Sequence, residues 1–178
     1  MLMLKMHTNR RPLLALILLA LAILAMLSAC GFRLRNAEQT NLPFKTIYLG
    51  FTENSALGIE LKRNIRANGS TAIVADRKLA EAIVEVVQPE KEEQVELSRN
   101  GQGQPVEYTL YYKFSFRVRD NKDRELLPAT PITITRYLPF NAALALAKET
   151  EKQGIYRDMQ TDMAQQIVRR LAALKPIE

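Results

Sequence analysis

The stretch Tyr108-Thr-Leu-Tyr-Tyr-Lys-Phe-Ser-Phe-Arg-Val118 carries the most regular pattern of the chain. Apolar or aromatic side chains recur at every second position, which is the period of a β-strand with one buried face. That set is Tyr108, Leu110, Tyr112, Phe114, Phe116 and Val118, and the opposite set is Glu107, Thr109, Tyr111, Lys113, Ser115, Arg117 and Arg119. The pattern predicts a long strand with one face on the core and an antiparallel neighbour.

Strand patterns flank this stretch on both sides. Ala82–Val87 is rich in β-branched residues, but Pro89 cannot donate to a ladder and shifts the pattern, so we expect an irregular or bulged strand there. Asn100-Gly101 favours a hairpin between that strand and the next. After a turn at 120–123, the alternation through 132–138 predicts a further strand.

A first strand and a helix precede these elements. Lys45–Phe51 alternates apolar with small or polar residues, as a half-buried strand does. Asn54 or Ser55 can cap a helix, and Asn68-Gly69 supplies the left-handed residue that ends it. The apolar positions of this helix are Leu57, Leu61 and Ile65. Their spacing of four residues places them on one face, which we expect to be core.

A second helix is expected near the end of the chain. Asn141 can cap the alanine-rich segment Ala142–Ala147, and a break is expected near Gly154. The residues after the break repeat with a helical period: Ile155, Met159, Met163, Ile167, Leu171 and Leu174. The order strand, helix, strand, strand, strand, helix predicts an α/β (α+β) fold. We expect a two-layer sandwich with a four-stranded mixed sheet and both helices on one face.

Residues 1–29 have the composition of an export signal. Lys5, Arg10 and Arg11 form a positive start, and Leu13–Leu27 follows without a polar side chain. The alternative is a transmembrane anchor, but this apolar run has 15 residues, which is short of the roughly 17–25 that a spanning helix needs. A cleaved signal peptide is therefore the better interpretation.

Leu27-Ser28-Ala29-Cys30 resembles a lipobox, in which lipoprotein signal peptidase cuts before a diacylated cysteine. Cys30 is the only cysteine in the sequence, so it has no disulfide partner within the chain; the alternative is a buried structural cysteine. Gly31 stands where an aspartate favours inner-membrane retention in enterobacterial lipoproteins, so the outer membrane is the expected location. We expect a lipidated tether at 30–44 and a single domain at 45–178.

Composition excludes several kinds of chemistry. His7, the one histidine, lies in the predicted signal peptide, so the mature chain cannot form a Ser–His–Asp triad or the usual zinc site. The acids clustered at 90–96 are typical of a solvated face, and we predict neither an enzyme nor a cofactor beyond the acyl groups on Cys30. Three of the 25 basic side chains lie in the signal peptide, leaving 22 against 19 acidic ones, so nothing in the charge requires nucleic acid.

Four motifs in order resemble the LptE family of LPS-assembly lipoproteins. They are Cys30-Gly-Phe-Arg-Leu-Arg35, Leu61-Lys-Arg-Asn-Ile-Arg-Ala-Asn-Gly69, Ser98-Arg-Asn-Gly-Gln102 with Glu107-Tyr108 after it, and Ala143-Leu-Ala-Leu-Ala-Lys148. Together they extend over nearly the whole mature chain. The sequence departs from the family at Phe32, where tryptophan is frequent, and at Arg33, where histidine is common.

The resemblance implies a role at the outer membrane. Family members plug the lumen of the β-barrel LptD and help lipopolysaccharide reach the outer leaflet. The family's lipopolysaccharide-binding residues carry over to Arg99 and Lys148, and both side chains suit the phosphates of lipid A. The alternative is that Arg99 flanks a solvated hairpin and Lys148 a helix end. Another class of function also stays open, a general periplasmic scaffold lipoprotein for barrel assembly or cell-wall attachment.

Overall fold

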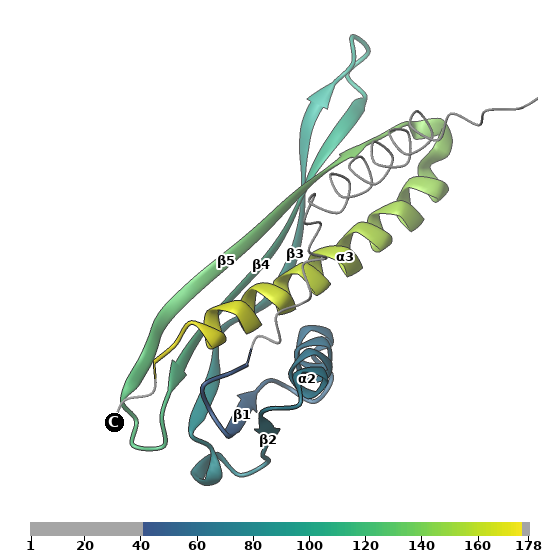
Figure 1. Ribbon diagram of the computed structural model, residues 1–178. Coiled ribbons are helices and arrows are strands. Elements are labelled where there is room, and N and C mark those ends of the chain that lie inside the picture. Colours follow the sequence, from purple (N-terminus) through teal and green to yellow (C-terminus); the bar gives the residue numbers. More distant parts are fainter. Residues whose placement is uncertain (1–40, 176–178) are drawn as a thin grey trace, which may run out of the picture. The chain divides into compact units, whose positions relative to one another are not determined.

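The computed structural model describes residues 41–175. Its elements are β1 (Thr46–Gly50), α2 (Ala56–Asn68), β2 (Ala72–Ile73), η1 (Arg77–Leu79), β3 (Ala82–Arg99), β4 (Pro105–Arg119), β5 (Glu125–Pro139), η2 (Ala142–Leu144) and α3 (Ala145–Ala172) (Figure 1). The five strands form one sheet in the order β2-β1-β3-β4-β5. β1 runs parallel to β2 and β3, and the other pairs are antiparallel. The predicted fold class is confirmed, with β2 as a short fifth strand.

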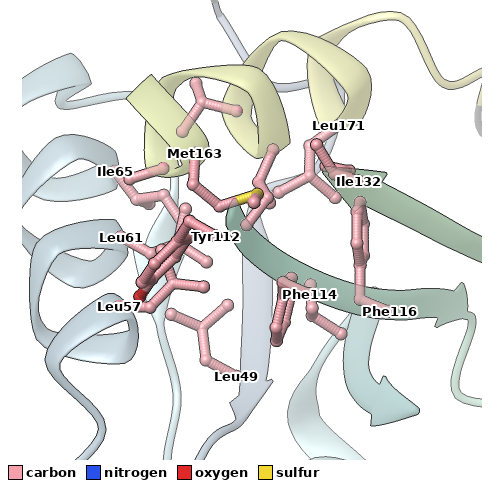
Figure 2. Packing of buried hydrophobic residues seen from close by; sticks show 14 of the residues in the cluster. Leu49, Leu57, Leu61, Ile65, Tyr112, Phe114, Phe116, Ile132, Met163 and Leu171 are labelled. Carbon is pink, nitrogen blue, oxygen red and sulfur yellow. The ribbon is translucent and has the colours of Figure 1, made fainter. Parts of the chain in front are cut away.

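β4 is the central strand of the long antiparallel part of the sheet. It pairs with β3 on one side and with β5 on the other. Leu110, Phe116 and Val118 are fully buried, as the alternation predicts. Figure 2 shows the β4 aromatic residues facing leucines of α2 and Met163 and Leu171 of α3. The core therefore lies between one face of the sheet and the two helices.

α2 begins and ends where the sequence predicts. The Ser55 hydroxyl accepts a hydrogen bond from the Gly58 N–H at 2.9 Å, which satisfies a donor in the first turn. Gly69 ends the helix with φ of 69°, a left-handed conformation that glycine adopts without steric cost. Leu57, Leu61 and Ile65 are fully buried against the sheet.

β3 is irregular around Pro89, as expected. Its pairing with β4 shifts register between Val86 and Gln88 and again between Gln88 and Lys91. In this region the Glu90 carboxylate accepts hydrogen bonds from three groups: the Ser55 hydroxyl, the Leu57 N–H and the Tyr112 hydroxyl. Glu90 thereby joins the bulged part of β3 to the start of α2 and to β4.

The structure of α3 differs in one respect from the expectation drawn from the sequence. A break was predicted near Gly154, but the helix runs without interruption from Ala145 to Ala172, so that prediction is wrong. A glycine in a helix interior costs only about 1 kcal/mol relative to alanine, and the buried residues that follow from Tyr156 onward hold the helix on the sheet. Tyr156, Met159, Met163, Ile167 and Leu171 form the buried stripe. Asn141 caps η2 by accepting a hydrogen bond from the Ala143 N–H at 3.0 Å.

The packed part of the chain includes the last residues of the predicted tether. Leu42 and Phe44 are buried and belong to the hydrophobic core. The predicted signal peptide at 1–29 and the predicted lipid attachment at Cys30 lie outside the described residues. No helix within 41–175 is long and apolar enough to cross a membrane.

Candidate functional site

Arg99 and Lys148 lie at the same end of the sheet. Arg99 pairs with Pro105 where β3 turns into β4, and Glu107 of β4 pairs with Pro139 where β5 ends. The Phe140 N–H then donates to the Val106 carbonyl at 2.8 Å, just before the chain enters α3. We call this the hairpin end: residues 95–108 of the β3–β4 hairpin and residues 137–148 of the turn from β5 into α3 (Figure 1).

Arg99 is an exposed cation held by its own hairpin. Its Nη2 donates to Glu96 Oε2 at 2.8 Å, its Nε also pairs with the Glu96 carboxylate, and its Nη1 donates to the Gly103 carbonyl at 2.7 Å. A guanidinium has more N–H donors than these contacts use. Glu96 and Gly103 therefore orient the side chain while leaving donors for an outside acceptor.

The hairpin loop fixes the position of the Gly103 carbonyl. The Asn100 side-chain oxygen accepts hydrogen bonds from the Gln102 and Gln104 N–H groups at 3.0 and 2.9 Å. Gly103 has φ of 78°, so the left-handed residue of this loop is Gly103 rather than Gly101 of the Asn-Gly pair. Asparagine at this position suits the loop because its side chain closes turns onto the following backbone.

Lys148 lies in the first turn of α3 and is much less exposed. Its side chain is 19% exposed, and its Nζ donates to Glu151 Oε2 at 2.8 Å. Lys152, one turn later, is also 19% exposed and pairs with Glu149 at 2.7 Å. Both lysines bury most of their stems while their ammonium groups stay paired, a common arrangement for long basic side chains.

Lys152 also connects α3 to the sheet. Its Nζ donates to Gln94 Oε1 of β3 at 3.2 Å, and the Tyr156 hydroxyl donates to the Glu93 carbonyl at 3.0 Å. These contacts place Lys152 and Tyr156 of α3 beside Glu93 and Gln94 of β3. Sequence reasoning did not identify Lys152, although its spacing of four residues from Lys148 is a signal that could have found it.

The pKa values of two carboxylates near α3 depend on this arrangement. Partial burial, with the negative charge of Glu90, raises the pKa of Glu92, which lies close to Lys152. The hydrogen bond from Lys152, with a second from Gln153, lowers the pKa of Glu149. Each cation of the hairpin end thus already has a carboxylate partner, and an anionic ligand must share or replace that partner.

A second cluster of charges lies toward the opposite end of the sheet, around Glu85. Its carboxylate pairs with Arg77 and with Arg117, each at 2.6 Å, while Arg119 Nε is 3.8 Å away. Burial alone would raise the pKa of Glu85, but the hydrogen bonds from Arg117 and Arg77 outweigh it and hold the pKa below its ordinary value. We interpret this cluster as an ion-pair network that joins η1 to the sheet.

Within 41–175, no group of three or more metal-ligating side chains could hold an ion. The described residues form a sheet with helices on one face and paired cations at one end. Solved bacterial lipoproteins share this fold. A lipoprotein B from Nitrosomonas europaea is 34% identical with a TM-score of 0.69, covering 80% of this chain and 91% of that one. The rare lipoprotein B from Shewanella oneidensis is 22% identical with a TM-score of 0.63, covering 72% and 94%.

The sequence comparisons identify the family. The LptE model, described as Lipopolysaccharide-assembly, matches residues 44–171, and the chain belongs to this family. The LPS-assembly lipoprotein LptE of Yersinia pestis is 26% identical over 164 residues, which is 91% of this chain and 77% of the relative. The protein of the same name from Yersinia pseudotuberculosis matches equally. The resemblance seen in the sequence motifs is thereby confirmed.

Proposed function

We propose that this chain is an outer-membrane lipoprotein that binds lipopolysaccharide, plugs a β-barrel partner of the LptD kind and assists lipopolysaccharide assembly at the cell surface. Family membership over residues 44–171 supports the role in assembly. The observation that carries the ligand assignment is the placement of Arg99 and Lys148 at one end of the sheet. The acyl groups on Cys30 would hold the domain at the membrane.

The phosphates of lipid A suit this pair of cations. A guanidinium binds phosphate through a planar fork, and an ammonium binds it as a point charge. Arg99 retains N–H donors beside its contacts with Glu96 and Gly103. Lys148 has a single carboxylate partner, Glu151, which a phosphate can replace or share.

The barrel partner is supported by the character of the sheet face that carries no helix. This face presents polar and charged side chains, among them Tyr111, Lys113 and Arg117, which are neither buried nor fully exposed. Lys113 pairs with Glu93 at 2.6 Å and lies over the Tyr111 ring. Such a face is compatible with the polar lumen of an outer-membrane barrel.

The barrel association is tested by purifying the full chain in detergent from its native membrane. We expect a large outer-membrane barrel to accompany it in stoichiometric amount, identified by mass spectrometry. Recovery of the chain without a barrel, or with cell-wall fragments instead, would contradict the proposal and favour a general scaffold lipoprotein.

The ligand assignment is tested by reversing both charges in Arg99→Asp with Lys148→Asp. Lipopolysaccharide affinity should fall at least about tenfold, since each charge-assisted contact contributes about 1.5–3 kcal/mol. The matched control reverses Lys78 and Lys122, which are exposed at the other end of the sheet. Equal lipopolysaccharide affinities in the two double variants would show that Arg99 and Lys148 do not bind the ligand. If the Arg99 and Lys148 double variant instead no longer co-purifies with the barrel, the two residues belong to the protein interface.

A further inference from the structure

Exposed large apolar side chains gather at the hairpin end. Nine such residues occur in the described part of the chain, and six of them lie there. The six are Val95, Leu97, Val106, Tyr137, Leu144 and Leu146. Val95 and Tyr137 both pair with Thr109, so they lie on the sheet face without helices, whereas Val106, Leu144 and Leu146 lie on or beside the segment that leads into α3. Single exposed apolar residues are normal on a protein surface, but a group of them on one segment indicates a site of interaction.

Two of these residues lie where α3 begins. Leu144 is 54% exposed and Leu146 is 84% exposed. From Ala145 to Glu151 the residues of α3 are exposed, with the exception of Lys148. The buried stripe starts later, at Tyr156. The first two turns of α3 therefore contribute little to the core, and the fold gives no reason for leucine at either position.

Further apolar groups lie beside this start of α3. The Phe140 ring contacts the Tyr108 ring edge-on, with 5.2 Å between the ring centres. Val106, which accepts the backbone hydrogen bond from Phe140, is itself partly exposed. The hairpin and the start of α3 thus offer apolar surface from two segments that are distant in sequence.

Cations accompany this apolar surface. Leu144 is the residue before α3 and Lys148 lies in the first turn of that helix, so the leucine and the cation belong to one short segment. Arg99 lies on the hairpin that carries Val106. Apolar groups next to cations are complementary to an amphiphile whose acyl chains are joined to a phosphorylated headgroup.

We propose that Leu144 and Leu146, with Val106 and Phe140 beside them, take the acyl chains of the ligand whose phosphates Arg99 and Lys148 bind. This inference rests on the proposed function, because it assumes that lipopolysaccharide is the ligand. The apolar side chains would bind the acyl chains, and the two cations would bind the phosphates. Removing either group of side chains should therefore lower the affinity for lipopolysaccharide on its own.

The experiment compares Leu144→Ser with Leu146→Ser, made together in the full chain, with the control pair Ile59→Ser and Leu79→Ser. Both control residues are exposed large apolar residues away from the hairpin end. Each protein is titrated with intact lipopolysaccharide and with the same lipopolysaccharide freed of its acyl chains by hydrolysis, its phosphates retained. The single variant Leu146→Ala is added because replacing so exposed a side chain should change the stability of the fold little.

The expected result is a loss of affinity for intact lipopolysaccharide on the order of tenfold in the Leu144 and Leu146 double variant. Leu146→Ala should lose part of this, and the control pair should lose none. Affinity for the deacylated form should be the same in all proteins. An unchanged affinity for intact lipopolysaccharide in both hairpin-end variants overturns the inference.

Two other occupants of this surface give different results. If the double variant binds lipopolysaccharide normally but no longer accompanies the barrel, the leucines belong to the protein interface and the inference is refuted. If the unaltered chain and the control pair form a dimer and the Leu144 and Leu146 double variant does not, this surface binds a second copy of the chain. The inference is again refuted. An unaltered chain that binds no lipopolysaccharide refutes the proposed function itself.

Discussion

Phe114 joins the sheet to the rest of the core. Its ring stacks on Phe51 with 5.5 Å between ring centres. It also stacks on its strand neighbour Phe116 at 5.9 Å, and both Phe114 and Phe116 are labelled in Figure 2. Phe114→Ala should lower the free energy of unfolding by about 3–5 kcal/mol, because it removes a buried ring and leaves a cavity. Thermal or urea denaturation measures the change.

The neighbouring Lys113 provides the control for this prediction. It points to the opposite face, where it is partly exposed and paired with Glu93. Lys113→Ala should therefore cost far less than Phe114→Ala. Similar losses in the two variants would show that the faces of β4 have been assigned the wrong way round.

The Tyr112 side chain makes the free energy of unfolding depend on pH in the alkaline range. Burial raises the pKa of Tyr112 above its ordinary value of 10.0, and the charge and hydrogen bonding of Glu90 raise it further. Because the folded chain holds this proton more tightly than the unfolded chain, the contribution is complete below pH about 10 and is lost as the pH rises above it.

Tyr112→Phe should therefore flatten the loss of stability above pH about 10. The measurement is urea denaturation of both proteins at a series of pH values from about 8 to 11. Tyr156, whose pKa burial also raises, leaves a residual slope in the variant. Identical slopes in the two proteins would mean that burial and Glu90 do not raise the pKa of Tyr112 in the folded chain.

Individual residues of the candidate site differ in how far the sequence could reveal them. Arg99 and Lys148 were identified because they stand in family motifs. The Glu96 contact with Arg99 spans three residues and is visible as a spacing. In contrast, Lys152 reaches Gln94 across 58 residues of chain. That contact depends on how α3 is placed along β3, which no local pattern encodes.

At the scale of elements, a substitution at Gly154 tests whether α3 is continuous. A Cβ at this position would meet only the end of the Arg157 side chain at 3.9 Å, so an alanine fits without strain. Gly154→Ala should raise the free energy of unfolding by about 0.5–1 kcal/mol, since glycine loses more backbone entropy in a helix. Denaturation curves and helical circular dichroism provide the measurement.

Gly69→Ala is the matched control, because its positive φ strains any side chain even though the space is open. It should destabilise the protein. Destabilisation by Gly154→Ala as well would support a break or bend at Gly154, as the sequence alone suggested.

Elements with a strong period were predicted and those without one were not. α2 and β4 carry long apolar repeats, and their positions agree closely with the prediction. β2 has two residues, which is too short to show alternation. Leu42 and Phe44 stand alone in a polar stretch, so only the tertiary structure reveals that they are core.

At the scale of the whole molecule, Cys30 lies outside the described residues 41–175, and the core of these residues is complete without a cysteine. Cys30→Ala should leave the melting temperature of the domain unchanged and block cleavage of the signal peptide. Intact-mass spectrometry and membrane fractionation measure both effects. A mature unaltered chain with an unmodified Cys30 would rule out lipid attachment there.

The direction and length of β3 determine how far the hairpin end lies from the start of the sheet. The chain enters the core at Leu42 and Phe44, before β1, and β1 and β3 both start at the end of the sheet away from the hairpin. At about 3.3 Å per residue, the 18 residues of β3 extend up to roughly 60 Å. This exceeds the roughly 30 Å of a bilayer's hydrocarbon core. If the chain is anchored by lipid in the inner leaflet and seated in a barrel, as proposed above, β3 is long enough to carry Arg99 across to the opposite leaflet while the anchor stays in place.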